Sequence, residues 1–513
     1  MSAAARPSPL PQVLPGRPYS TTASEYIGCF QGRAHVLPVN GDNIVVLNSP
    51  SEFHDYVLKG IRTAQRDITL ASLYIGTEGA PDTAVIEALA CAAAKHADEA
   101  PKITILLDAL RSTRPSKDPS GQLTSTALLL GRVMHPNAAA RQTPDIYLFH
   151  TPALRGMLKR LLPARTVGRY SYRVRSGGHL LPNRAGLDPL TAPSAFNAAL
   201  KVDLEQLFIP SSQPDEQPSS LSKSLADVGD LSERAHDQKE QHIAAADLPE
   251  YVTHLVTPDS SRAAGQAVPN LKSLHRQLPA ASWGPLAASS HVADSSVHDT
   301  CIIPMLQLGS AGVRQDEALT AEMLRLAQPG GRLTVSTAYL NLARPFHRAL
   351  ASASKVNVEM ITASPAANGF FNARGVSGFI PNAYSLLEQH TWQRLNRAWE
   401  RDNCSSSSHV LLEYDRPGWQ FHCKGIWYTP PGDDCPIAAT IGSPNYGYRS
   451  VIRDLEAHFL VVTTNASLRE AMAKEVQALR DHSQQVKQGH FNIPGRRATT
   501  AVRMAAHLLR GFL

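Results

Sequence analysis

The sequence is poor in three features that would assign a protein to a familiar class. Its six cysteines are scattered over 513 residues, with no C-x-x-C pair and no Cys/His cluster of the zinc-binding type. A disulfide framework and a structural zinc site are therefore not expected, and a reducing compartment is the default. The longest apolar runs fall well short of the ~18–20 residues that a membrane-spanning helix needs. We expect any contact with a membrane to be peripheral.

Acidic residues are absent from the first 24 positions. This segment carries Arg6 and Arg17 and is rich in Ala, Ser and Thr, a composition typical of a mitochondrial presequence. Its five prolines weaken that interpretation, because such presequences usually form an amphipathic helix. We interpret residues 1–25 as a presequence, with a disordered tail as the alternative.

The overall composition is that of a soluble globular protein. Hydrophobic residues make up 43% and charged residues 18%, and the length allows two or three domains. The net charge of +6 suits an anionic partner such as phosphate, nucleic acid or an acidic lipid surface, although many proteins of this charge have no such partner.

Two stretches of the chain repeat the same alternation of strands and helices. The first contains an expected turn and strand at 41–50, helix at 51–66, strand at 67–76, helix at 82–97 and strand at 102–110. The second contains a strand at 331–341, a helix at 345–353 and a strand at 355–364. We therefore predict an α/β protein with two similar α/β/α halves, at 26–209 and 299–513. The polar segment 210–298 is interpreted as an insertion or linker.

The second half contains "FHCKGIWYTP", residues 421–430, in which His422 and Lys424 are two positions apart. On a strand this spacing directs both side chains to one face. Imidazole can attack phosphorus or transfer a proton near neutral pH, and an ammonium group can hold phosphate oxygens. "IGSPNYGYRS" follows at 441–450 and supplies Ser443 and Asn445 in a tight turn.

This constellation resembles the phospholipase D superfamily, whose signature is H-x-K-x4-D followed by G-S-x-N. Together with "NGFFNARGVSGFIPNAYSLLEQ" and "YLFHTPALRGMLKRLLPAR", it is similar to the eukaryotic mitochondrial phosphatidylglycerophosphate synthases. The resemblance implies two such halves related by a pseudo-twofold axis. It further implies transfer of a phosphatidyl group from CDP-diacylglycerol to glycerol 3-phosphate at the mitochondrial inner membrane, towards phosphatidylglycerol and cardiolipin.

The resemblance also implies roles for individual residues. His422 would be the general acid/base, and Lys424, Ser443, Asn445 and Arg449 would hold phosphate oxygens. A carboxylate would orient the imidazole, and Glu456 is the candidate. No metal and no other cofactor is implied, and nucleic acid is not an expected partner. We also expect a peripheral contact with an anionic lipid surface, and a homodimer is possible.

The sequence departs from the superfamily signature in two places. Position 429, where the aspartate of H-x-K-x4-D would stand, is Thr429. More importantly, the first half has no H-x-K and no G-S-x-N turn, and His179 is followed by two leucines. Three explanations are open: an error in the sequence near residues 165–245, an inactive chain, or a homodimer that uses two copies of His422.

Other functions stay open as alternatives. A catalytically inactive lipid-binding homologue would keep the fold, and a phospholipase D-type phosphodiesterase would use water as the acceptor. Outside the second-half motifs, Asp108, Arg111 and Arg114 follow a strand end, where ligands of α/β proteins often bind. A solvated loop is the simpler interpretation. His150 is interpreted as structural.

Overall fold

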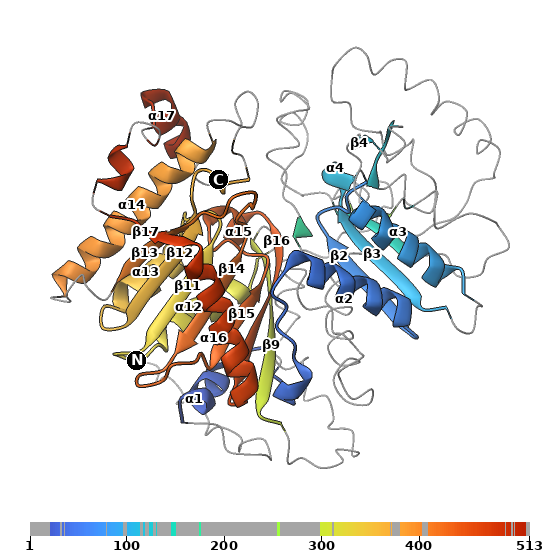
Figure 1. Cartoon of the computed structure of the whole chain (residues 1–513), viewed down its shortest axis with the longest axis horizontal. Helices are drawn as coiled ribbons and strands as arrows, with labels where there is room; N and C mark the ends of the chain where they lie inside the picture. Colours follow the sequence, from blue (N-terminus) through green and yellow to red (C-terminus); the bar gives the residue numbers. More distant parts are fainter. Residues whose placement is uncertain are drawn as a thin grey trace, which may run out of the picture.

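A computed structural model shows two sheets with helices packed on them and a small two-stranded sheet (Figure 1). It describes most of residues 21–130, the strand segments 145–149, 174–175 and 254–256, and most of residues 298–508, with short gaps in the first and last ranges. The predicted α/β class is confirmed. The predicted domain boundaries stay predictions, since much of residues 131–297 lies outside the described part.

The smaller sheet is parallel and lies in the first half. Its strand order is β2 (Asp67–Ser72), β3 (Lys102–Asp108), β6 (Asp145–Phe149) and β8 (His254–Val256). Two helices pack on it, α2 (Pro50–Thr63) and α3 (Ala80–Ala93). Buried aliphatic side chains such as Ile61, Leu89 and Ile105 fill the space between sheet and helices. Strands β2 and β3 and helices α2 and α3 match the predicted pattern, because their apolar periodicity is strong. Strands β6 and β8 were not predicted, and β8 lies within the segment 210–298 that was interpreted as an insertion or linker.

One predicted strand in this half is wrong. Residues 41–43 form a short 3-10 helix, η1, and no strand follows in the segment up to α2. The side chain of Asn40 accepts a hydrogen bond from the backbone N–H of Asp42, which turns the chain. A local side-chain cap of this kind competes with strand pairing. A short strand instead precedes the turn at β1 (Leu37–Val39).

The larger sheet is mixed and dominates the second half. Its strand order is β1, β9 (Thr300–Leu308), β16 (Leu455–Thr463), β15 (Ala438–Gly442), β14 (Lys424–Thr429), β11 (Arg332–Thr337), β12 (Asn357–Ala363), β13 (Val410–Tyr414) and β17 (Ser483–Gln485). The strands β11, β12 and β13 run parallel, whereas β14, β15, β16 and β9 pair antiparallel. The short strand β10 (Val313–Arg314) also pairs with β9 in this sheet. Strands β4 (Ser116–Lys117) and β5 (Leu123–Thr124) form a separate two-stranded sheet.

Helices cover both faces of the larger sheet. One face packs against α12 (Gln315–Arg325), α13 (Arg344–Ser352) and α14 (Ile380–Arg401), and the other against α16 (Ala466–Asp481), which lies in front of the sheet in Figure 1. The last helix, α17 (Thr500–Leu508), packs on α14. Strand β14 shows the expected alternation: Ile426 and Tyr428 join the first core, and Trp427 joins the core under α16.

Two segments from the first part of the chain join this larger body. Helix α1 (Thr21–Phe30) buries the side chain of Tyr26 in the core of the larger body. The ring of Tyr26 stacks on that of Tyr428 with 5.0 Å between ring centroids, and its hydroxyl donates to the backbone carbonyl of Met323. The short strand β7 (Val174–Arg175) pairs in parallel with β16. The predicted boundary at residue 25 therefore lies inside a helix of the larger body.

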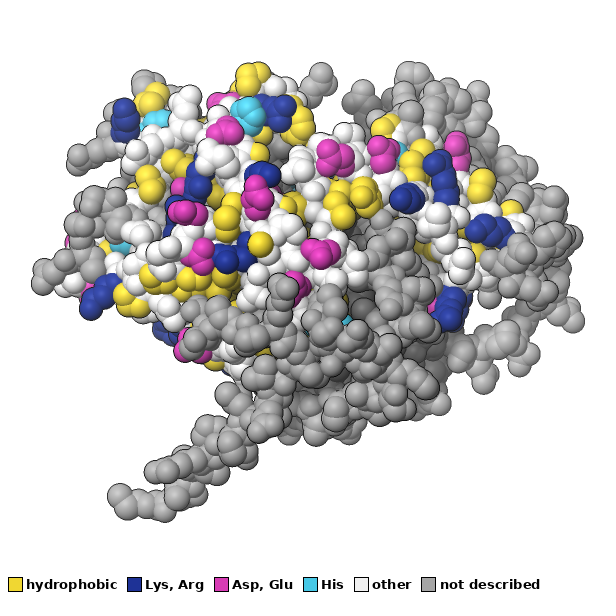
Figure 2. Space-filling view, turned by 60° about the horizontal axis from the view of Figure 1, so that its bottom comes forward, with side chains coloured by type: hydrophobic (Ala, Val, Ile, Leu, Met, Phe, Trp, Pro, Cys, Tyr) yellow, Lys and Arg dark blue, Asp and Glu magenta, His cyan; other side chains and the backbone are white. Residues whose placement is uncertain are grey.

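The described surface carries charges of both signs. Figure 2 shows Lys or Arg and Asp or Glu side chains interspersed with neutral ones on the face it presents. Among the described residues, no helix has the length and apolar character needed to cross a lipid bilayer.

Candidate active site

The H-x-K segment lies at the beginning of β14. The strand starts at Lys424, so His422 belongs to the extended segment just before it. The imidazole is exposed, and its ring centroid lies 6.0 Å from that of Tyr339 in an edge-to-face arrangement. The ammonium of Lys424 donates to the backbone carbonyl of His422 at 2.6 Å. This contact folds the lysine back along the histidine and places both functional groups at the strand end.

Cys423, between them, takes no nucleophilic role. Its side chain points into the core under α16, and burial raises the pKa of the thiol to about 11. A thiol with that pKa is protonated at neutral pH, and the thiolate is the nucleophilic form.

The G-S-P-N turn follows β15, the strand next to β14. Gly442 is required there by close approach, because a Cβ atom would lie 2.5 Å from the carbonyl oxygen of Ala457. The backbone N–H of Ser443 donates to that same carbonyl at 3.2 Å, and Ser443 and Asn445 are both buried. The amide oxygen of Asn445 has no hydrogen-bond partner in the described part of the chain.

Thr337 joins the two motifs. It is the cross-strand neighbour of Lys424 in the β11–β14 ladder, and its hydroxyl donates to the backbone carbonyl of Asn445 at 3.0 Å. The H-x-K segment and the G-S-P-N turn therefore meet at the end of β11, although they are about twenty residues apart in sequence. The structure brings His422, Lys424 and Asn445 to one edge of the sheet.

Arg449 has a carboxylate partner of its own. It lies on α15 (Tyr448–Ile452), and its Nε is 3.1 Å from Oδ2 of the buried Asp454. This ion pair offsets the charge that a phosphate would use, so Arg449 is a weaker phosphate ligand than Lys424 by this geometry. Its Nη2 is buried and has no hydrogen-bond partner among the described residues.

Glu456 lies on β16 and is buried at 1% exposure. Its neighbours across the sheet are Gln307 of β9 and Arg175 of β7. Strand β15 separates β16 from β14, which corresponds to about 9–10 Å between strand axes. A role for Glu456 in orienting His422 stays a prediction.

A buried polar network supports the G-S-P-N turn from behind. Tyr446 directly follows Asn445 with a left-handed φ of 57°, and its hydroxyl lies 3.2 Å from Oγ1 of Thr440 and 3.5 Å from Nε2 of His458. The other ring nitrogen of His458 lies 2.7 Å from Asp316. Burial raises the pKa of Tyr446, so the phenol stays neutral and can donate. Sequence reasoning missed this network, and the only local signal was a tyrosine after the asparagine.

The other residues considered from the sequence have a structural role, lie away from this site, or lie outside the described residues. Asp108 caps the short helix α4 (Ala109–Ser112), because its carboxylate accepts the backbone N–H of Arg111 at 2.8 Å. This is a structural role for Asp108. Thr429 is buried at the far end of β14. Arg114, His150 and nearly all of the segment 165–245 lie outside the described residues.

Comparisons with known proteins agree with this geometry. The chain is 29% identical to mouse "CDP-diacylglycerol--glycerol-3-phosphate 3-phosphatidyltransferase, mitochondrial" over 98% of its own length and 89% of the relative. A probable enzyme of the same name from Dictyostelium discoideum is 26% identical over 93% and 78% of the two chains. The chain is a homologue of these phosphatidyltransferases.

A solved structure shares the fold of this chain. Phosphatidylserine synthase of Haemophilus influenzae, a phospholipase D-like protein, superposes with a TM-score of 0.56 at 15% identity, covering 96% of this chain and 99% of that one. The predicted phospholipase D-like fold is thereby confirmed. No family model matches the chain.

Proposed function

We propose that the protein transfers a phosphatidyl group from CDP-diacylglycerol to sn-glycerol 3-phosphate, giving phosphatidylglycerophosphate and CMP. One observation carries the proposal: an H-x-K segment and a G-S-P-N turn meet at Thr337 in a homologue of enzymes that bear this name. The names of these relatives supply the donor and the acceptor.

The chemistry requires one phosphorus–oxygen bond to break and another to form. The bond between the phosphatidyl phosphorus and the bridging oxygen breaks, and CMP leaves after accepting a proton. The acceptor hydroxyl loses a proton as its oxygen bonds to phosphorus. His422 carries out one of these proton transfers, because its imidazole is exposed at the strand end and an imidazole can both accept and donate a proton.

Lys424 and the turn hold the phosphate oxygens. The ammonium of Lys424 has three N–H donors and lies at the strand end beside His422, where it can contact phosphate oxygens. Asn445 lies at the same edge through its contact with Thr337, and Ser443 precedes it in the turn. Positive charge and fixed dipoles at this edge stabilise the charge that develops on the transferred phosphoryl group.

A second nucleophilic or acid/base group is still needed for a two-step transfer. His422 is the only H-x-K histidine in the sequence. We infer that a homodimer supplies the second group as His422 of another copy. Measuring the mass in solution, together with mixing of wild-type and His422→Ala subunits, tests this. A mixed dimer would hold a single His422, so a shared site predicts that activity falls with the square of the wild-type fraction, and a linear fall contradicts it.

The names of the vertebrate relatives place those proteins in mitochondria. We propose the same compartment for this protein, with peripheral attachment to the inner membrane, where a lipid donor is accessible. The composition of residues 1–24 supports an address of this kind.

Identification of the product tests the proposed function. The purified chain is incubated with CDP-diacylglycerol vesicles and labelled glycerol 3-phosphate, and the lipids are separated. Labelled phosphatidylglycerophosphate supports the proposal. Phosphatidic acid formed at the same rate with and without glycerol 3-phosphate would instead show a phosphodiesterase that uses water. Vesicle binding without turnover would indicate a lipid-binding homologue.

A further inference from the structure

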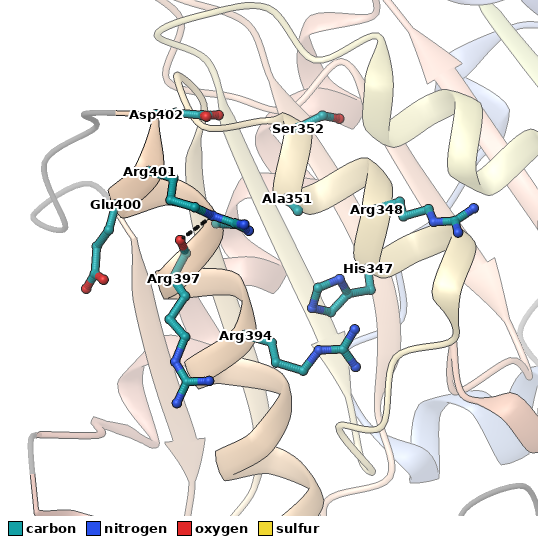
Figure 3. Close-up of a pocket in the computed structure, with 10 residues that line it drawn as sticks. His347, Arg348, Ala351, Ser352, Arg394, Arg397, Glu400, Arg401 and Asp402 are labelled. Atoms are coloured by element: carbon teal, nitrogen blue, oxygen red, sulfur yellow. Dashed lines mark hydrogen bonds between the residues drawn. The ribbon is translucent and has the colours of Figure 1, made fainter.

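An open, basic groove lies between the C-terminal halves of α13 and α14. Its cavity is about 1040 Å³ and is lined by Arg348 of α13 and by Arg394, Arg397 and Arg401 of α14. Figure 3 shows Arg394 and Arg401 extending towards α13, and Arg348 extending from the side of α13 away from α14. The small side chains of Ala351 and Ala398 form part of its lining. Four arginines therefore line a single groove, which is separate from the edge that carries His422.

The arginines of this groove differ from six other arginines that the structure describes. Other arginines form ion pairs: Arg314, Arg325, Arg449, Arg469, Arg480 and Arg496. The four groove arginines make no ion pair with any described carboxylate, and Arg401 donates only to the backbone carbonyl of Arg397. Figure 3 shows Glu400 extending away from α13. The cationic groups of the groove are thus available for an anionic ligand.

The spacing of these arginines fits several phosphates better than one. Arg394, Arg397 and Arg401 follow the i, i+3, i+7 pattern of a single helix face, over about 10 Å of helix. Their side chains are exposed, and they do not converge on an enclosed point. Guanidinium groups bind phosphate oxygens in a bidentate manner. Phosphate groups spread over a plane, as at a bilayer surface, match this row.

The position of the groove links it to the candidate active site. Helix α13 begins beside the G-S-P-N turn, where the N–H of Ala343 donates to the carbonyl of Tyr446 at 2.9 Å. Near the beginning of α14, Tyr384 stacks on Tyr339, the ring that lies against His422. Both helices therefore run from the active-site edge towards the groove.

We propose that this groove is the docking surface for an anionic phospholipid bilayer, whose phosphates bind Arg348, Arg394, Arg397 and Arg401. The inference rests on the proposed function in one respect, that the donor substrate is a lipid. A protein held at this surface keeps the active-site edge close to the membrane that contains its donor. The attraction is electrostatic, so it weakens as ionic strength rises.

Vesicle flotation tests the docking surface without requiring turnover. The full chain is mixed with phosphatidylcholine vesicles with or without phosphatidylglycerol. We expect binding only to the anionic vesicles, and weaker binding by a factor on the order of 100 for the variant Arg394→Gln/Arg397→Gln/Arg401→Gln, from about 1 kcal/mol per basic residue. A matched control, Lys59→Gln/Arg62→Gln/Arg66→Gln, removes the same charge from exposed positions of the first half and should bind as the wild type.

Two further measurements separate this proposal from its rivals. With CDP-diacylglycerol in detergent micelles, the groove variant should match the wild type in activity, whereas in anionic vesicles it should lose activity. Wild-type binding of the groove variant to anionic vesicles would overturn the proposal. Tight binding of inorganic phosphate to the wild type would also overturn the proposal if the groove variant lost that binding. Such a result would indicate a site for a soluble phosphate. Flotation results stand whether or not transfer is observed.

Discussion

The Nδ1 atom of His458 lies 2.7 Å from Oδ1 of Asp316, and both side chains are buried. Asp316 also accepts from the hydroxyl of Thr320 at 2.8 Å, so its position on α12 is fixed. On the other side, His458 reaches the hydroxyl of Tyr446, the residue after Asn445. This chain of contacts connects a helix of the core to the turn that holds the candidate phosphate ligands, and it gives the turn a rigid support.

Removal of the Tyr446 hydroxyl should therefore affect the turn as well as stability. In Tyr446→Phe, Thr440 and His458 each lose a buried partner, and the free energy of unfolding should fall by about 1–2 kcal/mol. We expect kcat to fall while KM changes little, because the substrate-binding groups stay present but less well placed. Urea unfolding and steady-state kinetics measure both quantities.

Tyr26→Phe provides the matched control for that prediction. It removes a hydrogen bond from another buried tyrosine, to the carbonyl of Met323, away from the candidate site. It should lower stability by a similar amount and leave kcat unchanged. Equal losses of kcat in the two variants would show that Tyr446 acts through stability alone.

Helix α1 should be an integral part of the larger body. Truncation of the buried Tyr26 side chain in Tyr26→Ala removes its stacking on Tyr428 and leaves a cavity, so the free energy of unfolding should fall by about 3–4 kcal/mol. The half-exposed Tyr74 serves as the comparison, and Tyr74→Ala should cost under about 1 kcal/mol. A wild-type stability for Tyr26→Ala would mean that α1 does not pack as described.

Glu475 makes stability depend on pH. Burial raises the pKa of this carboxyl to about 7 in the folded protein, although Trp427 donates to it at 3.1 Å. Between about pH 4.5 and 7 the folded state binds the proton that the unfolded state has lost, so stability falls as pH rises through this window. This contribution to stability is fully present below the pKa of Glu475 in the unfolded state.

The variant Glu475→Gln isolates this contribution. The amide keeps the shape and can accept from Trp427, but it cannot ionise. Unfolding measured from pH 4.5 to 8 should show a variant that gains about 3 kcal/mol over the wild type at the alkaline end. Identical pH profiles for the two proteins would exclude Glu475 as the source.

Local pattern predicted the parts of the fold in which periodicity is strong. Strands β2, β3, β11 and β12 and helices α2 and α13 lie where alternating or helical apolar spacing placed them. The strand predicted within 41–50 was wrong because the side chain of Asn40 caps a turn there and replaces strand pairing. The long helix α14 was not predicted, and neither was the antiparallel strand β9 that joins β1 to β16.

The candidate site divides in the same way. Sequence alone could propose four site residues, because they fall in two short motifs whose residue types indicate phosphate chemistry: His422, Lys424, Ser443 and Asn445. The link through Thr337 could not be proposed, because it depends on the register between β11 and β14, about 90 residues apart. The His458–Asp316 contact joins residues separated by 142 positions, and only the fold creates it.

Phosphatidyl transfer by the full chain, with His422→Ala as the variant, tests the central claim most directly. Purified protein is given CDP-diacylglycerol and labelled glycerol 3-phosphate, and both labelled lipid and CMP are measured. The exposed His482→Ala serves as the histidine control. We predict one CMP per labelled phosphatidylglycerophosphate, wild-type rates for His482→Ala, and a loss of roughly 1000-fold for His422→Ala. An undiminished rate in His422→Ala, or no labelled lipid from a folded wild-type chain, would contradict it.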